Sequence, residues 1–375
     1  MPARGARITL EEVRDFAAVE AAWRDLESRA APSFFQSWTW VGCLAGERFP
    51  DPVLLRAERG GRIVGLALLN RIGGRMGEQL WLGESGDAAL DAVYVEHNGP
   101  LLARDAADLL GPCLHALLAA PVAPRARAPW LGRRVRLAGV DAAVRAAAEA
   151  AGVVRLRHDA VAPSIDFSRL APGPEGFLAA LSANTRAQLR RSDRAFAAAG
   201  PIAARRAETP EEVEAFLGEL AALHQARWQA RGKPGAFANP AFVRFHRALL
   251  ARALPRGEAV LLRVTAGAAL IGLLYNVRLG GREAAYQSGF AYASAPAHGK
   301  PGLSCHHAAI VRARAEGIAE YDFLAGADRY KTSFANRATS LHWVETTARG
   351  TPTGRMMRLQ ACARMVWKRI ETILR

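Results

Sequence analysis

The sequence predicts an α/β protein composed of two similar halves. The chain has 375 residues, more than one ordinary hydrophobic core organises, and this length predicts two domains. Residues 53–75, VLLRAERGGRIVGLALLNRIGGR, agree with residues 260–282, VLLRVTAGAALIGLLYNVRLGGR, at eleven of twenty-three positions. Strand-like and helix-like patterns alternate in both halves, as they do in α/β lobes. The repeat therefore indicates that the two domains are copies of one another.

The first half begins with two helical patterns and continues into a hairpin. Apolar residues recur at helical spacing over 11–30, and Pro32 ends that helix; a second apolar helix covers 34–49. Gly60 and Gly61 supply the hairpin turn. The predicted strands of this half are 53–58, 62–72, 79–83, 91–102, 133–140 and 153–158, and its further helices are 104–120 and 141–152.

The second half follows a turn-rich passage at 166–176, which is the best candidate linker. We therefore place an N-terminal lobe at 1–165, a C-terminal lobe at 166–350 and a closing helix at 351–375. The predicted helices of the second lobe are 177–200, 210–232, 240–257 and 303–317, and its strands are 202–208, 260–265, 269–279, 283–290 and 320–326. Residues 329–348 are predicted to form a loop and a final strand.

Composition limits the classes of protein and of partner. The net charge of +15 favours polyanionic partners, although only four of the fifty basic residues are lysine, as expected where an arginine-rich composition covers every surface. No eighteen-residue apolar run indicates a membrane span, and the first residues lack a secretory signal, so a cytoplasmic protein is expected. The four cysteines are far apart without a CxxC pair, which predicts neither disulfides nor a structural zinc site.

One candidate anion site lies where the strand at 283–290 leads through a turn-rich loop into the helix that begins near residue 303. Gly299 and Gly302 permit close backbone approach, Lys300 adds a positive charge, and a helix start favours phosphate. An ordinary strand-to-helix connection is an equally good interpretation. The adjacent Cys305, His306 and His307 cannot close around one ion, because helix neighbours point about 100° apart. No metal is therefore expected.

Two further groups of residues are candidates. Arg186, Arg190 and Arg194 recur every four residues and form a basic stripe along a helix, which fits either a phosphate or carboxylate site or a solvated face. The passage YDFLAGADRYKTSF contains Asp322, Asp328, Tyr330 and Lys331 just after a strand, where α/β proteins gather their sites. A buried carboxylate must be paired or have a raised pKa, which suits a general base, an amine-binding group or a structural ion pair.

Taken together, these features resemble a known family. The resemblance rests on the segments LSANTRAQLRRSDRAFAAAG, LHQARWQARGKPGAFA and GREAAYQSGF through FLAGADRYKTSF. They resemble the GNAT-like acyltransferases of the cellulose-biosynthesis CelD/BcsL type, distant relatives of the Fem-type peptidyltransferases. The resemblance covers roughly residues 30–345 and is densest over 176–335. It implies tandem duplicated GNAT-like lobes, each a mixed, mostly antiparallel sheet flanked by helices, with the repeated hairpin as a shared early pair of strands.

The resemblance also implies a binding site for an acyl donor, acyl-CoA such as acetyl-CoA. The donor's pantetheine arm would lie beside the strand that contains Gln287, Ser288 and Gly289, and its pyrophosphate would lie at the turn that contains Gly299, Lys300, Gly302, Leu303 and Ser304. This turn departs from the usual Q/R-x-x-G-x-G/A pattern. The residues expected to bind the acceptor substrate are Arg186, Arg190, Trp228 and Tyr275.

The mechanism implied is direct acyl transfer to an amine or hydroxyl of a small molecule or glycan precursor. Asp322 is expected to act as base or to orient an amine, and Lys331 to stabilise the oxyanion, since it loosely matches the lysine of the Fem-type Y-x-F-K pattern. Tyr330 or Tyr286 could serve as acid. On this hypothesis Lys331→Ala and Asp322→Asn each abolish transfer.

Two other functions remain open from the sequence. The basic surplus would suit aminoacyl transfer from charged tRNA, whereas DNA is not an expected partner. A membrane-peripheral scaffold in envelope-polysaccharide assembly would use the tail as a basic amphipathic helix on anionic lipid, against the alternative that the tail docks on a lobe. The apolar residues of that tail are Met356, Met357, Leu359, Met365, Val366, Trp367, Ile370 and Leu374, and the basic ones are Arg358, Arg364, Lys368, Arg369 and Arg375.

Overall fold

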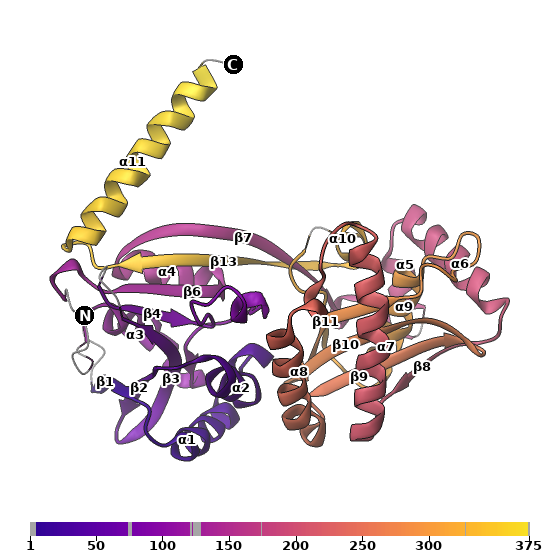
Figure 1. The fold of residues 1–375 in the computed structure, drawn as a ribbon, viewed down its shortest axis with the longest axis horizontal. Helices are drawn as coiled ribbons and strands as arrows, with labels where there is room; N and C mark the ends of the chain where they lie inside the picture. The colour runs from indigo at the N-terminus through magenta and orange to yellow at the C-terminus, as the bar shows by residue number, and fades with distance from the viewer. Residues whose placement is uncertain are drawn as a thin grey trace. The chain divides into compact units, whose positions relative to one another are not determined.

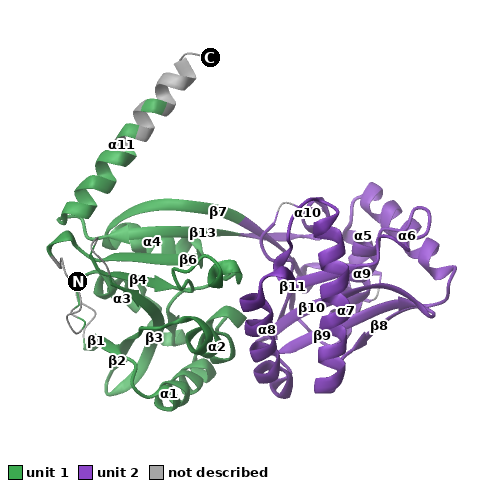
Figure 2. Cartoon of the chain, in the orientation of Figure 1, with its two compact units in different colours: residues 1–160, 340–375 green, residues 161–339 purple. Residues whose placement is uncertain are grey.

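The computed structural model describes residues 5–73, 77–120, 122, 129–173, 175–326 and 328–373. The chain divides into two compact units (Figure 2). Unit 1 consists of Met1–Ala160 and Ser340–Arg375, and unit 2 consists of Val161–Thr339. The sequence analysis placed the domain boundaries at 165/166 and 350/351. In the structure, residues 340–375 belong to the first unit.

Unit 1 is a mixed sheet with helices between its strands (Figure 1). Its strands run in the order β1-β2-β3-β4-β6-β13, with the short β5 paired to β3. All the described neighbours are antiparallel except β4 and β6. The strands are β1 (Ala6–Glu12), β2 (Pro52–Arg59), β3 (Arg62–Ile72), β4 (Gln79–Leu82), β5 (Leu101–Leu102), β6 (Arg134–Val140) and β13 (Arg337–Thr347), and the helices are α1 (Phe16–Arg29), α2 (Trp38–Arg48), α3 (Leu110–Ala119), α4 (Ala142–Ala151) and α11 (Pro352–Ile373).

Unit 2 repeats this arrangement. Its strands run in the order β8-β9-β10-β11-β12-β7, and again one neighbouring pair, β11 and β12, is parallel. The strands are β7 (Val153–Asp166), β8 (Ile202–Arg206), β9 (Ala259–Ala266), β10 (Ala269–Leu279), β11 (Arg282–Phe290) and β12 (Glu320–Asp322), and the helices are α5 (Gly176–Ala180), α6 (Ala183–Ala197), α7 (Pro210–Gln229), α8 (Pro240–Ala253), α9 (Pro301–Ala315) and α10 (Arg329–Phe334).

The repeated sequence forms the same hairpin in both units. The strands β9 and β10 begin and end at the residues that correspond, in the sequence repeat, to the first and last residues of β2 and β3. Each hairpin also has its register shift at the same place, where Gly65 pairs with Ala57 and Gly272 pairs with Val264. A bulge at one fixed position is a structural feature that two unrelated hairpins would not share. The predicted fold class, tandem lobes with a mostly antiparallel sheet, is confirmed.

The last strand of each unit is supplied from the other half of the sequence. β7 follows α4 of unit 1 along the chain, but its end pairs with β12 of unit 2, Ile165 opposite Tyr321. β13 follows α10 of unit 2, and its end pairs with β6 of unit 1, Val344 opposite Leu137. The two copies have thus exchanged their terminal strands.

Several elements differ from the sequence-based prediction. The strand predicted at 91–102 is mostly irregular, because Gln36 donates side-chain hydrogen bonds to the carbonyls of Gly99 and Pro100 in place of a strand partner. The helix predicted over 177–200 breaks at Ser182, whose side chain caps α6 by accepting the Thr185 N–H. Strand β1 and helix α10 were not predicted.

In unit 2 the helices α7 and α9 lie on opposite faces of the sheet. A Cβ on Gly289 of β11 would meet the Leu220 carbonyl of α7 at 2.5 Å, whereas a Cβ on Gly272 of β10 would meet Cys305 of α9 at 3.1 Å. Gly272 pairs with Phe290, the residue after Gly289, and successive strand residues point to opposite faces. The α9 face holds a core of buried residues that includes Val260, Leu262, Ile271, Leu274, Ile310, Tyr321 and Phe323.

The closing helix α11 covers most of the predicted tail. Of the tail residues named above, Met356, Arg358, Leu359 and Trp367 are exposed and Met357 is buried. Helical backbone is described as far as Ile373, but the side chains of Arg364, Met365, Val366 and those from Lys368 onward lie outside the description. Over the described ranges, no helix combines the length and the apolar character needed to cross a membrane.

Candidate functional site

The candidate site of unit 2 lies where β11 separates from β12. The two strands pair only from Arg282 opposite Glu320 to Ala284 opposite Asp322. Tyr286 is then an extra residue on β11, because Ala285 pairs with Asn276 and Gln287 with Tyr275. Such a bulge bends its strand, and Leu324 after β12 has a left-handed φ of 56°. Among the described strands, none continues the pairing of β11 on this side, so its edge is open.

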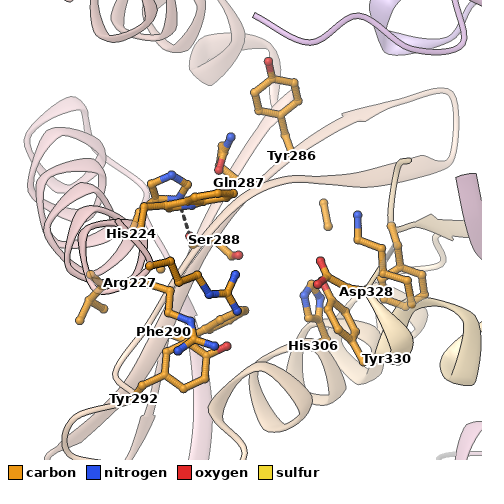
Figure 3. Close-up of a pocket in the computed structure, with 17 residues that line it drawn as sticks. His224, Arg227, Tyr286, Gln287, Ser288, Phe290, Tyr292, His306, Asp328 and Tyr330 are labelled. Carbon is orange, nitrogen blue, oxygen red and sulfur yellow. Dashed lines mark hydrogen bonds between the residues drawn. The ribbon is translucent and has the colours of Figure 1, made fainter. Parts of the chain in front are cut away.

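A cavity of about 280 Å³ occupies the space beside this open edge. Figure 3 shows that its walls come from α7, β11, the first turns of α9, and the segment around α10. The lining residues are Leu223, His224, Arg227, Trp228, Arg231, Ala285, Tyr286, Gln287, Ser288, Gly289, Phe290, Tyr292, His306, Phe323, Asp328, Tyr330 and Lys331. Of the residues predicted to hold the donor beside β11, Gln287, Ser288 and Gly289 all line it.

A second hollow of about 630 Å³ adjoins the first at the start of α9. The two share Phe290, Tyr292 and Tyr330 as lining residues, so they are two arms of one site. The second arm, which we call the α9 arm, contains the predicted turn residues Gly299, Lys300, Gly302 and Leu303, together with Asn184, Thr185, Gln188, Pro301, Arg329 and Ser333. We call the first the α7 arm.

His306 is the most deeply buried polar side chain of the α7 arm, with 1% of its surface exposed. Its ring stacks on Tyr330, with centroids 4.9 Å apart. Burial lowers the pKa of His306 to about 3, and the charge of Lys331 acts in the same direction. The imidazole is therefore neutral at physiological pH.

A buried hydrogen-bond chain leads from Glu283 through Asn276 and Tyr321 to His306 Nδ1. Asn276 donates from Nδ2 to Glu283 Oε1 at 2.7 Å and to the Tyr321 hydroxyl oxygen at 3.3 Å. The Tyr321 hydroxyl lies 3.2 Å from His306 Nδ1, and burial raises the pKa of Tyr321 so that it keeps its proton. Since Tyr321 accepts from Asn276, its own proton is available for donation to Nδ1, and we assign the hydrogen bond in this direction.

The neutral His306 ring then carries its single proton on Nε2. Among the described residues this buried atom has no hydrogen-bond partner. A buried polar atom without a partner is costly, which points to a ligand atom that completes the site. His306 thus offers an uncharged N–H donor to the α7 arm.

Tyr330 and Lys331, both predicted as catalytic, line the α7 arm beside His306. Burial raises the pKa of Tyr330, and Asp328 and Tyr292 act in the same direction, so this phenol stays protonated. Lys331 donates from Nζ to the carbonyls of Leu324 at 3.3 Å and Ala325 at 2.9 Å. The ammonium group therefore holds the loop after β12 while it places a positive charge near His306.

The wall formed by α7 and the turn after it carries two arginines. Arg227 and Arg231 are four residues apart and line the α7 arm. The guanidinium carbon of Arg227 lies 4.4 Å from the ring centroid of Tyr292, within cation–π distance. The carboxylate of Asp328 lies on the other side of the cavity, with His306 and Tyr330 (Figure 3).

His224 links the walls of the site. Its Nδ1 lies 3.3 Å from the Ser288 carbonyl, and the Ala236 N–H donates to its Nε2 at 3.4 Å. The first contact requires a proton on Nδ1 and the second a lone pair on Nε2, so both ring nitrogens are used. Burial lowers the pKa of His224, which favours this neutral form.

The start of α9 offers fewer donors than the sequence predicted. Pro301 has no N–H, and the N–H groups of Leu303 and Ser304 both donate to the Lys300 carbonyl, at 3.0 and 3.2 Å. Ser304 is buried and its hydroxyl lies 2.8 Å from that of Ser192 on α6, so it does not line either arm. Ser192 also accepts the Lys300 N–H at 2.8 Å, which ties α6 to α9.

Three predicted residues take structural positions. Asp322 is 1% exposed and is not part of the cavity lining; its Oδ1 accepts the Leu324 N–H at 2.7 Å, which supports the left-handed turn. Its predicted role as base does not fit this place. Tyr275 is likewise buried away from the cavity, with its hydroxyl 3.3 Å from His246 Nδ1. Tyr286 lines the cavity, but its ring packs on those of His246 and Tyr275, and Figure 3 shows it directed away from His306 and Tyr330.

The predicted arginine stripe lies elsewhere. Arg186, Arg190 and Arg194 line a separate hollow of about 560 Å³ along α6. Arg186 donates to the Leu178 carbonyl at 3.3 Å, and Arg190 lies 3.5 Å from Glu175, with both side chains of that pair exposed. Their predicted contact with the acceptor in the catalytic cavity is therefore not supported, whereas the predicted Trp228 does line it.

Sequence reasoning missed His306, Arg227 and Arg231. The spacing of Arg227 and Arg231 after His224 on one helix was visible, but nothing in the sequence showed that this helix lies over β11. His306 was weighed only as a metal ligand. Within the described ranges, the structure contains no group of three His, Cys, Asp or Glu side chains arranged to hold a metal ion.

Comparisons with known proteins agree with this fold. The sequence model of the acetyltransferase (GNAT) domain matches residues 183–332, which contain all the lining residues of the α7 arm and all those of the α9 arm except Ser333. No curated protein matches the chain. The structure is similar to FemX, with a TM-score of 0.54 and 10% identity, over 88% of this chain and 96% of that one.

Two further structures have the same fold. One is a conserved protein of unknown function from Bacteroides thetaiotaomicron, with a TM-score of 0.52 and 10% identity over 88% of this chain and 97% of that one. The other is the C-terminal domain of a putative lysylphosphatidylglycerol synthetase from Agrobacterium fabrum, with a TM-score of 0.51 and 12% identity over 91% and 95%. At these identities the likeness concerns the fold alone.

Proposed function

We propose that unit 2 catalyses the transfer of an acyl group to an amine or hydroxyl acceptor. The observation that carries the proposal is that the uncharged His306 ring, whose Nε2 has no hydrogen-bond partner among the described residues, belongs to the lining of a cavity beside the open edge of β11. A fixed donor beside an open strand edge suits the stabilisation of a developing oxyanion, which requires donors that need no rearrangement during the reaction. The GNAT domain match over residues 183–332 supports the same reaction class.

In the proposed mechanism the acceptor binds in the α7 arm and its nitrogen or oxygen attacks the acyl carbonyl carbon. The carbonyl π electrons move to oxygen, and the oxyanion accepts hydrogen bonds from His306 Nε2–H, with the nearby charge of Lys331 adding stabilisation. The proton of the attacking group goes to the Asp328 carboxylate. When the tetrahedral intermediate collapses, the bond to the leaving group breaks and Tyr330 supplies the proton that this group takes up.

The donor we propose is an acyl-CoA that enters through the α9 arm. Lys300 lies at the mouth of this arm, where its Nζ donates to Gln188 at 2.7 Å, and Gly302 keeps the start of α9 open, since a Cβ there would contact the Phe290 ring at 3.3 Å. The residues thus accommodate a phosphate-bearing chain. When bound, the thioester would supply the activated acyl group.

A ligand screen by thermal shift tests the donor. The chain is heated with acetyl-CoA, longer acyl-CoAs and CoA, and at least one should raise the melting temperature, because a ligand that binds only the native state stabilises it. Lys300→Gln should reduce the shift. The absence of a shift with every CoA species would remove acyl-CoA as the donor.

A second candidate is aminoacyl transfer from charged tRNA. Its specific support is the arginine-lined hollow along α6, which could bind backbone phosphates. A salt-sensitive gel shift with tRNA, lost in Arg186→Gln/Arg190→Gln, would favour it; no shift at low salt would exclude it.

The biological setting we propose follows the sequence resemblance. A protein of the CelD/BcsL type would act in the cytoplasm, or at the inner face of the membrane, on a precursor of an envelope polysaccharide. Vesicle flotation of the full chain and of a chain without residues 352–375 would show whether α11 contributes membrane binding.

A further inference from the structure

We propose that the acceptor is an amine that also carries an anionic group, a carboxylate or a phosphate, and that Arg227 and Arg231 bind this group. The inference rests on the proposed transfer reaction and identifies the substrate class of the same site. Its basis is the distribution of charge on the walls of the α7 arm.

The two arginines differ from others in unit 2. Nine arginines described in this unit form ion pairs with glutamates, namely Arg190, Arg205, Arg247, Arg256, Arg263, Arg278, Arg282, Arg312 and Arg337. For Arg227 and Arg231, the described part of the chain provides no carboxylate within ion-pair distance. Two unpaired guanidinium groups on one wall of a cavity form a site for an anion, because their planar forks match carboxylate and phosphate oxygens.

The geometry keeps these groups in place. Arg227 lies in the last turn of α7 and Arg231 in the turn that follows the helix, where its N–H donates to the Trp228 carbonyl at 3.0 Å; the stacking of Arg227 on Tyr292 restricts the plane of its guanidinium group. Burial raises the pKa of Tyr292, while both arginines lower it, so both guanidinium charges act on the same point of the cavity wall.

The opposite wall has the complementary charge. The Asp328 carboxylate lies beside His306 and Tyr330 (Figure 3), and it raises the pKa values of both Tyr292 and Tyr330. A molecule with an ammonium group and an anionic group would satisfy both walls. Its nitrogen would lie beside Asp328 and His306, where transfer takes place, and its anion on the α7 side.

The proposed binding site for the anion of the acceptor is also separate from the proposed binding site of the donor. Arg227 and Arg231 line only the α7 arm, whereas Lys300 and the start of α9 line only the α9 arm. The phosphates of a donor in the α9 arm would not need the arginine pair. The pair therefore selects the acceptor.

Calorimetric titration with small amines tests the inference without any turnover. O-phosphoethanolamine and β-alanine carry the two kinds of anion, and ethanolamine and propylamine are their matched amines without one. We expect the anionic probes to bind the full-length chain about tenfold or more tightly than their partners. Arg227→Gln/Arg231→Gln should abolish this preference, and Arg227→Lys should weaken it, because lysine lacks the fork.

The control is Arg252→Gln on α8, which removes the same charge from an exposed position outside both arms and should keep the preference. Equal binding of anionic and matched amines to the native chain would overturn the inference, as would a preference that survives in the double variant. CoA is titrated into the same variants. If the double variant weakens CoA instead, the pair serves the donor and the inference is wrong; if CoA binds nowhere while the arginine-dependent preference holds, only the proposed donor fails.

Discussion

At the scale of single residues, His306 shows how packing converts an ordinary side chain into a specific donor. The ring is neutral because it is buried, and its proton lies on Nε2 because Tyr321 already donates to Nδ1. Both conditions come from neighbours distant in sequence, Asn276 and Glu283 among them. No pattern around residue 306 contains this information, which is why the sequence directed attention to Asp322 instead.

Replacement of His306 by phenylalanine tests its proposed role. The ring shape is retained but the Nε2–H is lost, so kcat should fall by about 10²–10³, the typical effect of removing one oxyanion donor. The KM for the donor should change little. Steady-state kinetics with the donor found by thermal shift provides the measurement, and Tyr321→Phe, which removes the fixed tautomer but not the ring, should lower kcat by a smaller factor. Full activity in His306→Phe would disprove the assignment.

The same substitution has an effect on stability that depends on pH. The pKa of His306 is about 3 in the folded chain, against an ordinary histidine value of about 6.5 in the unfolded chain, so the unfolded chain binds an extra proton between these values. Stability is therefore complete above pH 6.5 and falls as the pH falls, by about 2 kcal/mol between pH 8 and pH 5. Urea unfolding at both pH values should show that His306→Phe loses less stability on acidification than the native chain. Equal losses of stability on acidification in His306→Phe and in the native chain would contradict a buried, neutral His306 ring.

Asp322 should affect stability more than chemistry. Its Oδ1 accepts the Leu324 N–H at a turn with a left-handed φ, so Asp322→Ala leaves a buried donor without its partner. The expected loss is about 1–3 kcal/mol in the free energy of unfolding. Asp322→Asn keeps an acceptor oxygen and should lose less, with kcat reduced far less than in His306→Phe. A selective loss of kcat in Asp322→Asn at unchanged stability would restore the base assigned from the sequence.

At the scale of elements, two glycines of unit 2 have opposite roles. A Cβ on Gly289 would lie 2.5 Å from the Leu220 carbonyl, so Gly289→Ala must push α7 away from β11, at a cost of about 1–3 kcal/mol. Gly218, two residues before Leu220 on α7, has open space around it, and Gly218→Ala should stabilise the helix by about 0.5–1 kcal/mol. Chemical denaturation of both variants measures the difference. If Gly289→Ala were as stable as the native chain, α7 and β11 would not be in close contact.

The elements also show what the sequence could predict. The repeated hairpin was evident because its residues recur at a fixed offset, and β2, β3, β9 and β10 match that offset. The long strand β7 was predicted only to residue 158, since nothing in a sequence shows that a strand continues from one compact unit into the other. Helix α10 was missed for a related reason: its one buried residue, Phe334, packs against Phe177, which lies far away in the sequence.

At the scale of the whole molecule, the exchanged strands make the two units unequal as fragments. Residues 161–339 contain every described strand segment of the unit 2 sheet, including the end of β7, where Ile165 is buried. Residues 5–160 lack β13, whose Leu341 and Val344 are fully buried in unit 1. They also lack Glu345, which lies 3.1 Å from Arg136 and 2.9 Å from Arg155.

We therefore expect fragment 161–339 to unfold cooperatively and fragment 5–160 to fail to do so. Burial of a leucine or valine side chain contributes about 1.5–3 kcal/mol, so loss of both removes much of the stability of a small domain and exposes the edge of β6. Joining residues 337–350 to the end of fragment 5–160 through a flexible linker restores the missing strand and should restore cooperative unfolding, as followed by circular dichroism. Because the linker adds no side chains to the core, recovery would be due to β13 alone. Cooperative unfolding of fragment 5–160 by itself would mean that the exchanged strand is not needed for the first unit to fold.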